Sequence, residues 1–418
     1  MFNKIKHGWF FMKKKFLLCI FIFLFIFQLQ VLATDDEIDY AWIKETVMAA
    51  TTAEDIEILS RCAVAYDRNS KTIIYGKNEE EKVPMASTTK IMTAIILVEN
   101  ANLDEEVIVC KKAAMVGGST INLKTGDKIT YNDLLYGLML ESGNDAATQI
   151  AISLAGSTEE FAELMNDKAK ELGLKSTHFV TPHGLDNEEH YTTATELAII
   201  ADYALNIPKI AEVVSTKNYI IHINGYPKAL SNTNELLGYL EGVNGVKTGF
   251  TNGAGRCLVT SAKRGDFEII TAILGADTKK IRTKDSINLI EYVYKNYELI
   301  NLGEFVQEEF AKWTEANKNR IDIDKARKYE IKLKLGEIKY IYYPIRKDKK
   351  DKIFVDTIKN NLMLEAPVDK GYVLANIFLR IEDDKIMNVP IKLDNSITKK
   401  NIFDYFIESL SIFETVRF

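Results

Sequence analysis

The spacing of apolar residues changes along the chain, and each spacing predicts a different kind of element. Two short apolar runs, at residues 63–66 and 72–75, enclose the turn-forming residues 67–71, which predicts a β-hairpin. After Ser87 the apolar residues recur at intervals of three and four as far as Val98, which predicts a helix. Three further helices are predicted over residues 131–155, 159–172 and 195–205.

Beyond Lys247 the pattern returns to strands and then closes with one more helix. The strands are predicted over residues 257–262 and 268–274, and the helix over residues 285–297. Strands at both ends with helices between them favour an antiparallel sheet flanked by helices over alternating β/α units. The predicted fold class is therefore α+β.

From about residue 300, alternating apolar and polar residues indicate a small all-β second domain. Its strands are predicted over residues 329–335, 338–343, 372–381 and 386–393. Residues 401–418 return to helical spacing, and one side of this helix gathers Phe403, Phe406, Ile407, Leu410 and Phe413. Such a face is typical of a helix lying on a membrane surface, although a helix packed on its own domain would show the same pattern.

The first 33 residues are predicted to be a secretory signal peptide. Three lysines at residues 13–15 precede an apolar run at 16–27, and Val31-Leu32-Ala33 offers a small-residue cleavage site. This run is short for a membrane span, which needs about 20 residues, so an uncleaved anchor is the less favoured alternative. The predicted domains are residues 1–33, 34–298, 299–395 and the amphipathic helix 396–418.

Composition and charge narrow the possible functions. The 418 residues suffice for two domains, and 47% hydrophobic and 27% charged residues are ordinary globular values. Loss of the five lysines of residues 1–33 would take the net charge from −6 to −11, which provides no long-range attraction to nucleic acid. The remaining cysteines, Cys62, Cys110 and Cys257, lack disulfide or metal-ligand spacing. We therefore expect no nucleic-acid partner, no metal and no cofactor.

Three short motifs carry the candidate chemistry. They are Ser87-Thr88-Thr89-Lys90, Ser142-Gly143-Asn144 and Lys247-Thr248-Gly249. Each motif is weak alone, because the chain also contains decoys: Ser396-Ile397-Thr398-Lys399, Ser286-Ile287-Asn288 and Lys124-Thr125-Gly126. The first set is distinguished by its order, with Ser142 55 residues after Ser87 and Lys247 105 residues after Ser142.

The first motif has the spacing that nucleophilic catalysis needs. A serine hydroxyl is a poor nucleophile unless a nearby base takes its proton. Residues three apart at the start of a helix share a face, so Lys90 can reach Ser87. Burial and the nearby positive charge of Lys247 and of the helix N-terminus would destabilise the Lys90 ammonium and make it an adequate base. The alternative for such a serine taken alone is a simple helix cap.

The motif set resembles that of the penicillin-binding protein and serine β-lactamase superfamily. The longer segments at residues 84–93, 183–186, 190–194 and 245–251 resemble landmarks of the low-molecular-mass D-alanyl-D-alanine carboxypeptidases. This likeness runs from about residue 62 to 297 and continues more faintly through residues 364–371. It implies a β-lactamase/transpeptidase-like catalytic domain over residues 34–298, followed by the β-rich domain.

The resemblance also implies an activity. The enzyme would remove the terminal D-alanine from peptidoglycan stem peptides ending in D-Ala-D-Ala, and β-lactam antibiotics would acylate it. The predicted signal peptide would place this reaction outside the cytoplasmic membrane, on its outer face or in the cell wall space. A D,D-endopeptidase, a β-lactamase and a non-catalytic peptidoglycan-binding protein remain alternatives. The β-lactamase is disfavoured because no Glu-x-x-Leu-Asn sequence is present; the nearest segment is 202–206, which begins with Asp202.

Roles for the reacting groups follow from the same resemblance. Ser87 would attack the carbonyl carbon between the two D-alanines, and Lys90 would be its base. Ser142 would relay a proton to the departing D-alanine. The backbone amides of Ser87 and Phe250 would form the oxyanion hole. A cap-and-turn role is the alternative for Ser142.

The remaining residues would bind the substrate. Asn144 would position the substrate amide, while Lys247 and Thr248 would face the terminal carboxylate. Arg282, at the matching distance beyond the third motif, would bind the same carboxylate. A surface salt bridge is the alternative for Arg282.

Overall fold

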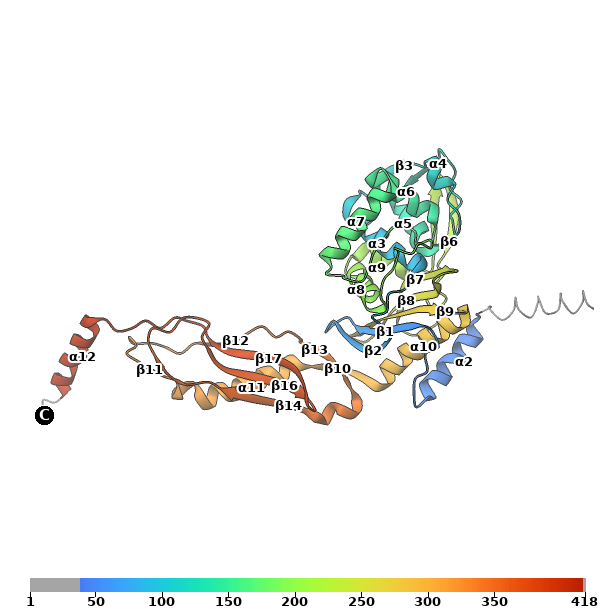
Figure 1. Ribbon diagram of the computed structural model, residues 1–418. Helices are drawn as coiled ribbons and strands as arrows, with labels where there is room; N and C mark the ends of the chain where they lie inside the picture. Colours follow the sequence, from blue (N-terminus) through green and yellow to red (C-terminus); the bar gives the residue numbers. More distant parts are fainter. Residues whose placement is uncertain (1–37, 416–418) are drawn as a thin grey trace, which may run out of the picture. The chain divides into compact units, whose positions relative to one another are not determined.

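The structure, a computed structural model, describes residues 38–415, so the predicted signal peptide at residues 1–33 lies outside the described residues. The described chain divides into two compact units (Figure 1). The first unit runs to Arg68 and resumes over Thr72–Lys295, and the second consists of Asn69–Lys71 and the chain from Asn296 onward.

The first unit is built around a five-stranded antiparallel sheet with the strand order β2-β1-β9-β8-β7. The strands are β1 (Cys62–Asp67), β2 (Thr72–Lys77), β7 (Val243–Thr251), β8 (Gly255–Arg264) and β9 (Phe267–Ala276). The predicted hairpin is β1–β2, and β1 also pairs with β9 through Cys62 opposite Leu274. Strands from both ends of the unit therefore share one sheet, which confirms the predicted α+β class.

Helices cover both faces of this sheet (Figure 1). Helix α10 (Lys279–Asn296) lies along one face with α2 (Tyr40–Thr52) beside it, and α8 (Ala194–Leu205) packs against β1 and β9 on the other face. Every residue of β1 is buried for this reason, because a strand covered on both sides cannot alternate between core and solvent.

The helical body surrounds α3 (Lys90–Asn100), which is buried from Lys90 to Leu97. An α-helix that is apolar nearly all round must lie in the interior, and α3 contacts helices on several sides. Its neighbours are α5 (Tyr131–Leu140), α6 (Asn144–Ala155), α7 (Thr158–Glu171), α8 and α9 (Pro208–Ser215). Smaller elements complete the unit: α4 (Lys111–Ala114) and the hairpins β3–β4 (Glu106–Ile108, Lys128–Thr130) and β5–β6 (Asn218–Ile223, Tyr226–Ser231).

One helix prediction was wrong in a way that matters for the site. Residues 131–155 do not form one helix, because α5 ends at Leu140 and α6 begins at Asn144. Ser142, in the gap, has φ +62°, a left-handed conformation that a helix cannot contain. The apolar spacing on the two sides is continuous, so the pattern did not reveal the break. The hairpin β5–β6 and helix α9 were also not predicted.

The second unit contains the predicted β domain. Its main sheet is antiparallel with the order β12-β17-β16-β14. These strands are Leu333–Leu335, Asp384–Leu393, Val373–Ile381 and Ile353–Lys359, respectively; β10 (Tyr297–Asn301) pairs with β13 (Tyr342–Arg346), and β11 (Asp322–Asp324) with β15 (Met363–Glu365). Helix α11 (Leu302–Asn317), which was not predicted, packs on β14 and β16. Its core positions, including Val306 and Trp313, do recur at helical spacing.

Candidate active site

Ser87 lies in a single 3-10 turn, η1 (Ala86–Thr89), that leads directly into α3. Ala86 has φ +48°, and Gly184 lies so close that a Cβ there would overlap the carbonyl oxygen of Ala86. Glycine is required at position 184 by this approach and by its own φ of +82°. Thr89 Oγ1 donates to Ala86 O at 2.8 Å and holds the turn from inside. The nucleophile segment is therefore clamped by backbone contacts, while Ser87 itself remains partly exposed.

The Lys90 amine is bound by three oxygen atoms. Nζ lies 2.9 Å from Ser87 Oγ, 2.7 Å from Asn144 Oδ1 and 2.9 Å from His183 O. Asn144 Nδ2 donates to Gly117 O at 2.7 Å, which fixes the orientation of that amide. The oxygens of Asn144 and His183 can only accept, whereas a hydroxyl can also donate. A neutral amine has two N–H groups and one lone pair, so this geometry suits an unprotonated Lys90 that accepts a hydrogen bond from Ser87.

The surroundings of Lys90 favour that neutral form. Its side chain is 0% exposed, and burial, followed by the charge of Lys247, lowers the pKa of the Lys90 ammonium well below its usual value. Asp145 acts in the opposite direction but is a smaller influence. Burial and the Lys247 charge, two of the three causes expected from the sequence, therefore act on this lysine.

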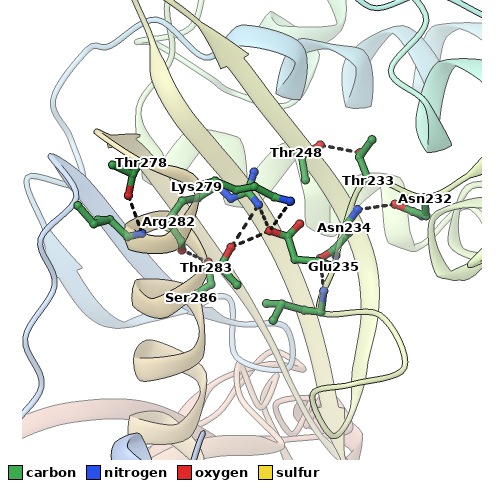
Figure 2. A network of polar contacts seen from close by, with 12 residues as sticks. Asn232, Thr233, Asn234, Glu235, Thr248, Thr278, Lys279, Arg282, Thr283 and Ser286 are labelled. Carbon is green, nitrogen blue, oxygen red and sulfur yellow. Dashed lines mark hydrogen bonds and ion pairs between the residues drawn. The ribbon is translucent and has the colours of Figure 1, made fainter. Parts of the chain in front are cut away.

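The third motif lies on β7, against the nucleophile turn. A Cβ added at Gly249 would lie 3.1 Å from Ser87 N, so the strand approaches the turn as closely as glycine allows. Lys247 is 1% exposed and donates to Thr248 O at 3.1 Å. Burial, with a smaller contribution from the Arg282 charge, lowers the pKa of Lys247 to about 7. The Thr248 hydroxyl shares a 2.7 Å hydrogen bond with the Thr233 hydroxyl (Figure 2).

Ser87, Lys90 and Asn144 form one hydrogen-bonded set. Among residues 38–415, no side-chain hydrogen bond joins Ser142 or Phe250 to this set. Ser142 Oγ is buried and has no hydrogen-bond partner within residues 38–415. Phe250 follows Gly249 on β7, and the centroid of its half-exposed ring lies 3.9 Å from the guanidinium carbon of Arg256. The structure thus joins Ser87, Lys90 and Asn144 directly and places Phe250 in the adjacent strand.

Arg282 projects from the first turns of α10 and is 3% exposed. It forms an ion pair with Glu235, which belongs to the loop between β6 and β7 (Figure 2). Glu235 was not among the site residues predicted from the sequence. No local pattern could have identified it, because its partner lies 47 residues away. Arg282 makes a buried salt bridge here, not the surface pair that the sequence left open.

Two histidines near the nucleophile have structural contacts. His190 Nε2 lies 2.7 Å from Thr89 Oγ1, and Val180 N donates to Nδ1 at 2.9 Å, so the ring proton is on Nε2. Burial lowers the pKa of His190 to about 4 and that of His183 to about 3. Both rings are neutral at physiological pH. Within residues 38–415, no group of three His, Cys, Asp or Glu side chains could hold a metal ion.

The decoy motifs lie in other settings. Ser396 is exposed on an extended segment, where its Oγ accepts from Lys370 N, and the neighbouring Ile397 pairs with Val368. Ser286 Oγ donates to Arg282 O within α10. Order along the chain therefore selected the one Ser-x-x-Lys whose lysine is buried beside its serine.

Comparison with known proteins decides the family. The sequence model of D-alanyl-D-alanine carboxypeptidase matches residues 48–278. The chain belongs to the D-alanyl-D-alanine carboxypeptidase family. In this carboxypeptidase the model of the penicillin-binding protein 5 C-terminal domain also matches, over residues 314–399. Both matches confirm the resemblance and the arrangement of a catalytic domain followed by a β domain.

Individual relatives agree with the family match. The D-alanyl-D-alanine carboxypeptidase DacF of Bacillus subtilis is 32% identical over 352 residues, which cover 83% of this chain and 88% of the relative. Penicillin-binding protein 5 from Haemophilus influenzae superposes with a TM-score of 0.68 at 25% identity, covering 83% of this chain and all of that one. The Streptomyces K15 DD-transpeptidase gives a TM-score of 0.55 at 34% identity, covering 57% and 98%.

Family membership confirms the predicted activity. The chain is a serine hydrolase, a D-Ala-D-Ala carboxypeptidase of peptidoglycan. A serine acyl-enzyme mechanism and penicillin binding are general properties of this family.

Proposed function

We propose that Ser87 is the residue acylated by the substrate and that Lys90 takes its proton. The observation that carries this assignment is the 2.9 Å contact between Lys90 Nζ and Ser87 Oγ, made by a lysine whose other two partners can only accept. Ser87 Oγ attacks the carbonyl carbon between the two D-alanines, and its proton moves to Lys90. Such a positioned base typically contributes about 10²- to 10⁴-fold in rate.

Collapse of the tetrahedral intermediate breaks the peptide C–N bond and releases D-alanine. The departing nitrogen needs a proton, which Ser142 Oγ passes on from Lys90. This role is supported by the buried, unpartnered hydroxyl of Ser142 within the described chain. Water then attacks the ester carbonyl carbon; its oxygen stays with the peptide, and one of its protons returns to Ser87 Oγ.

The negative charge on the former carbonyl oxygen is stabilised by the backbone N–H groups of Ser87 and Phe250. The close approach of β7 to Ser87 N at Gly249 supports this pairing. Loss of one donor in an oxyanion hole costs about 10²- to 10³-fold in rate.

Asn144 positions the substrate amide, and Lys247, Thr248 and Arg282 recognise the terminal carboxylate. Lys247 and Arg282 supply positive charge, and the Thr248 hydroxyl supplies a hydrogen bond. Arg282 lies close enough to Lys247 for its charge to lower the pKa of the Lys247 ammonium.

One experiment tests the assignment of the nucleophile directly. Protein treated with benzylpenicillin is digested, and the modified peptide is identified by mass spectrometry. We expect the adduct on Ser87, together with release of free D-alanine from a pentapeptide ending in D-Ala-D-Ala. An adduct on another residue would move the nucleophile elsewhere, and absence of D-alanine release would contradict the carboxypeptidase activity.

We propose that the enzyme releases the penicilloyl group slowly and is therefore not a β-lactamase. Asp202, the nearest counterpart of a deacylating glutamate, lies in α8, where Arg68 Nε donates to its Oδ1 at 2.9 Å. A carboxylate held in this ion pair is poorly suited to activate water. A fluorescent penicillin label lost within seconds would favour the β-lactamase.

We also propose that the chain is exported by its residues 1–33 and attaches to the membrane surface through α12 (Ile402–Thr415). Attachment is supported by five apolar side chains of α12 that are 51–80% exposed: Ile402, Phe403, Phe406, Ile407 and Leu410. The side chain of Phe413 lies outside the described residues. No helix of residues 38–415 is long and apolar enough to cross a bilayer. Deletion of residues 396–418 should release the signal-cleaved protein from membranes without loss of activity on soluble peptide. Unchanged partitioning would contradict the attachment.

We propose that residues 34–298 form the catalytic domain, residues 299–395 the β-rich domain and residues 396–418 the attachment helix. Limited proteolysis with mass spectrometry of the fragments would test these limits.

A further inference from the structure

Glu235 places a carboxylate of the protein at the site proposed for the carboxylate of the substrate. Its Oε1 accepts from Arg282 Nη2 and, at 2.8 Å, from Thr283 Oγ1, and it lies 4.0 Å from Lys279 Nζ (Figure 2). The three donors belong to the start of α10, whereas Glu235 belongs to the loop before β7. A carboxylate oxygen surrounded by two cations and a hydroxyl is bound as a substrate anion would be.

The ion pair is largely removed from water. The side chain of Arg282 is 4% exposed and that of Glu235 is 12% exposed. A charge-assisted hydrogen bond in such a setting is strong, because neither partner is well solvated when the pair separates. The interaction is also incomplete, since Glu235 Oε2 and Arg282 Nε are buried without hydrogen-bond partners among the described residues. Arg282 therefore keeps a donor that Glu235 does not use.

The loop that carries Glu235 is fastened to the third motif. Two residues before Glu235, the Thr233 hydroxyl bonds the Thr248 hydroxyl (Figure 2). Asn234 Nδ2 donates to Gly245 O at 2.9 Å. These contacts hold Glu235 beside β7, so its distance from the motif is set by the fold. The negative charge of Glu235 therefore lies next to Arg282, one of the two cations proposed to recognise the substrate carboxylate.

We propose that Glu235 is a specificity-determining residue that occupies Arg282 in the substrate-free site, so that the terminal carboxylate of the substrate must compete with it. This inference deepens the proposed function and rests on the proposed role of Arg282. Competition weakens the preference for a charged C terminus over an uncharged one. Glu235 thereby lowers the advantage of a free terminal carboxylate over a carboxamide.

The experiment compares two substrates in the full chain. One is a stem-peptide mimic ending in D-Ala-D-Ala, and the other is the same peptide with a C-terminal carboxamide. The selectivity is the ratio of their kcat/KM values. Glu235→Gln removes the competing charge but keeps the shape, so the selectivity should rise by about tenfold, the scale of one hydrogen bond to a charged group. Glu235→Ala should raise the selectivity by a similar factor, and it replaces Glu235→Gln in the experiment if the glutamine variant does not fold.

Arg282→Ala should lower the selectivity, and adding Glu235→Gln to it should have no further effect. Glu241→Gln, an exposed acid in the same loop, is the matched control and should leave the selectivity unchanged.

The outcomes separate this inference from the proposed function. If both Glu235 variants change the two substrates equally, Glu235 is only a structural clamp and the inference is wrong. If Arg282→Ala leaves the selectivity unchanged, the carboxylate role of Arg282 fails and the inference fails with it. Absence of D-alanine release by the unmodified protein would instead contradict the assigned activity.

Discussion

Two lysines in the site are almost equally buried, yet their surroundings differ. Lys90 has three oxygen partners from three separate segments, whereas Lys247 donates to the carbonyl of its own neighbour, Thr248. Burial lowers the pKa of both ammonium groups. The partners then distinguish them: Lys90 is held against Ser87, and Lys247 keeps N–H donors for a ligand. Two similarly buried lysines can therefore have different roles, with Lys90 suited to act as a base and Lys247 suited to bind a ligand.

The largest expected effect is removal of the nucleophile from the Lys90 region. Ser87→Ala should lower D-alanine release by about 10⁴-fold or more and abolish the penicillin adduct. Turnover is measured with a pentapeptide, and the adduct by mass spectrometry. Ser396→Ala alters the exposed decoy motif and is the matched control. Labelling that persists in Ser87→Ala but disappears in Ser396→Ala would reverse the assignment.

Replacing the base should have the next largest effect. Lys90→Met keeps the length of the side chain but cannot take a proton, so acylation by penicillin should slow by about 10²- to 10⁴-fold. The acylation rate is followed with a fluorescent penicillin. Lys399→Met, in the decoy motif, should leave the rate unchanged. A rate in Lys90→Met close to that of the unmodified chain would show that another group acts as the base.

A methyl group placed between the two regions tests their close approach. In Gly249→Ala the new Cβ would lie 3.1–3.2 Å from Ser87 N, Ala86 Cβ and Met85 O. The strand or the turn must then shift by a few tenths of an ångström, and acylation should slow by about tenfold. At Gly117 an added Cβ meets nothing within 4 Å, so Gly117→Ala is the control. Equal rates in both variants would mean that the contact between β7 and the turn is not critical.

The smallest expected effect is a pH dependence that separates the lysines. The pKa of Lys247 is about 7 in the substrate-free protein, and only its ammonium form attracts a carboxylate. The value of kcat/KM, which reports the free enzyme, should therefore fall as pH rises through about 7. A bound carboxylate raises the pKa of Lys247, so the matching decline in kcat should occur at higher pH.

The control for this profile is Lys247→Arg, which stays protonated over the whole range and should lose the alkaline decline. Loss of activity toward low pH should persist in that variant, because it belongs to protonation of Lys90. An alkaline decline that survives Lys247→Arg would assign it to another group.

Much of the fold and of the site could be predicted because the signals are local. The β1–β2 hairpin, α3 and the strands after Lys247 follow from apolar spacing over short windows. Ser87 and Lys90 share a helix start, so their contact follows from a separation of three residues. The break at Ser142 was missed because α5 and α6 have the same apolar period on its two sides.

By itself, the sequence determined the order of the three motifs, the choice of Ser87 over its decoy and the membership of a carboxypeptidase family. Those conclusions depend on residue types within short motifs and on the order of these motifs along the chain. Only the tertiary structure decided that His183 O and Asn144 Oδ1 bind Lys90 and that Glu235 binds Arg282. These partners come from segments tens of residues apart, so their meeting depends on how the helices and the sheet pack, which no local pattern records.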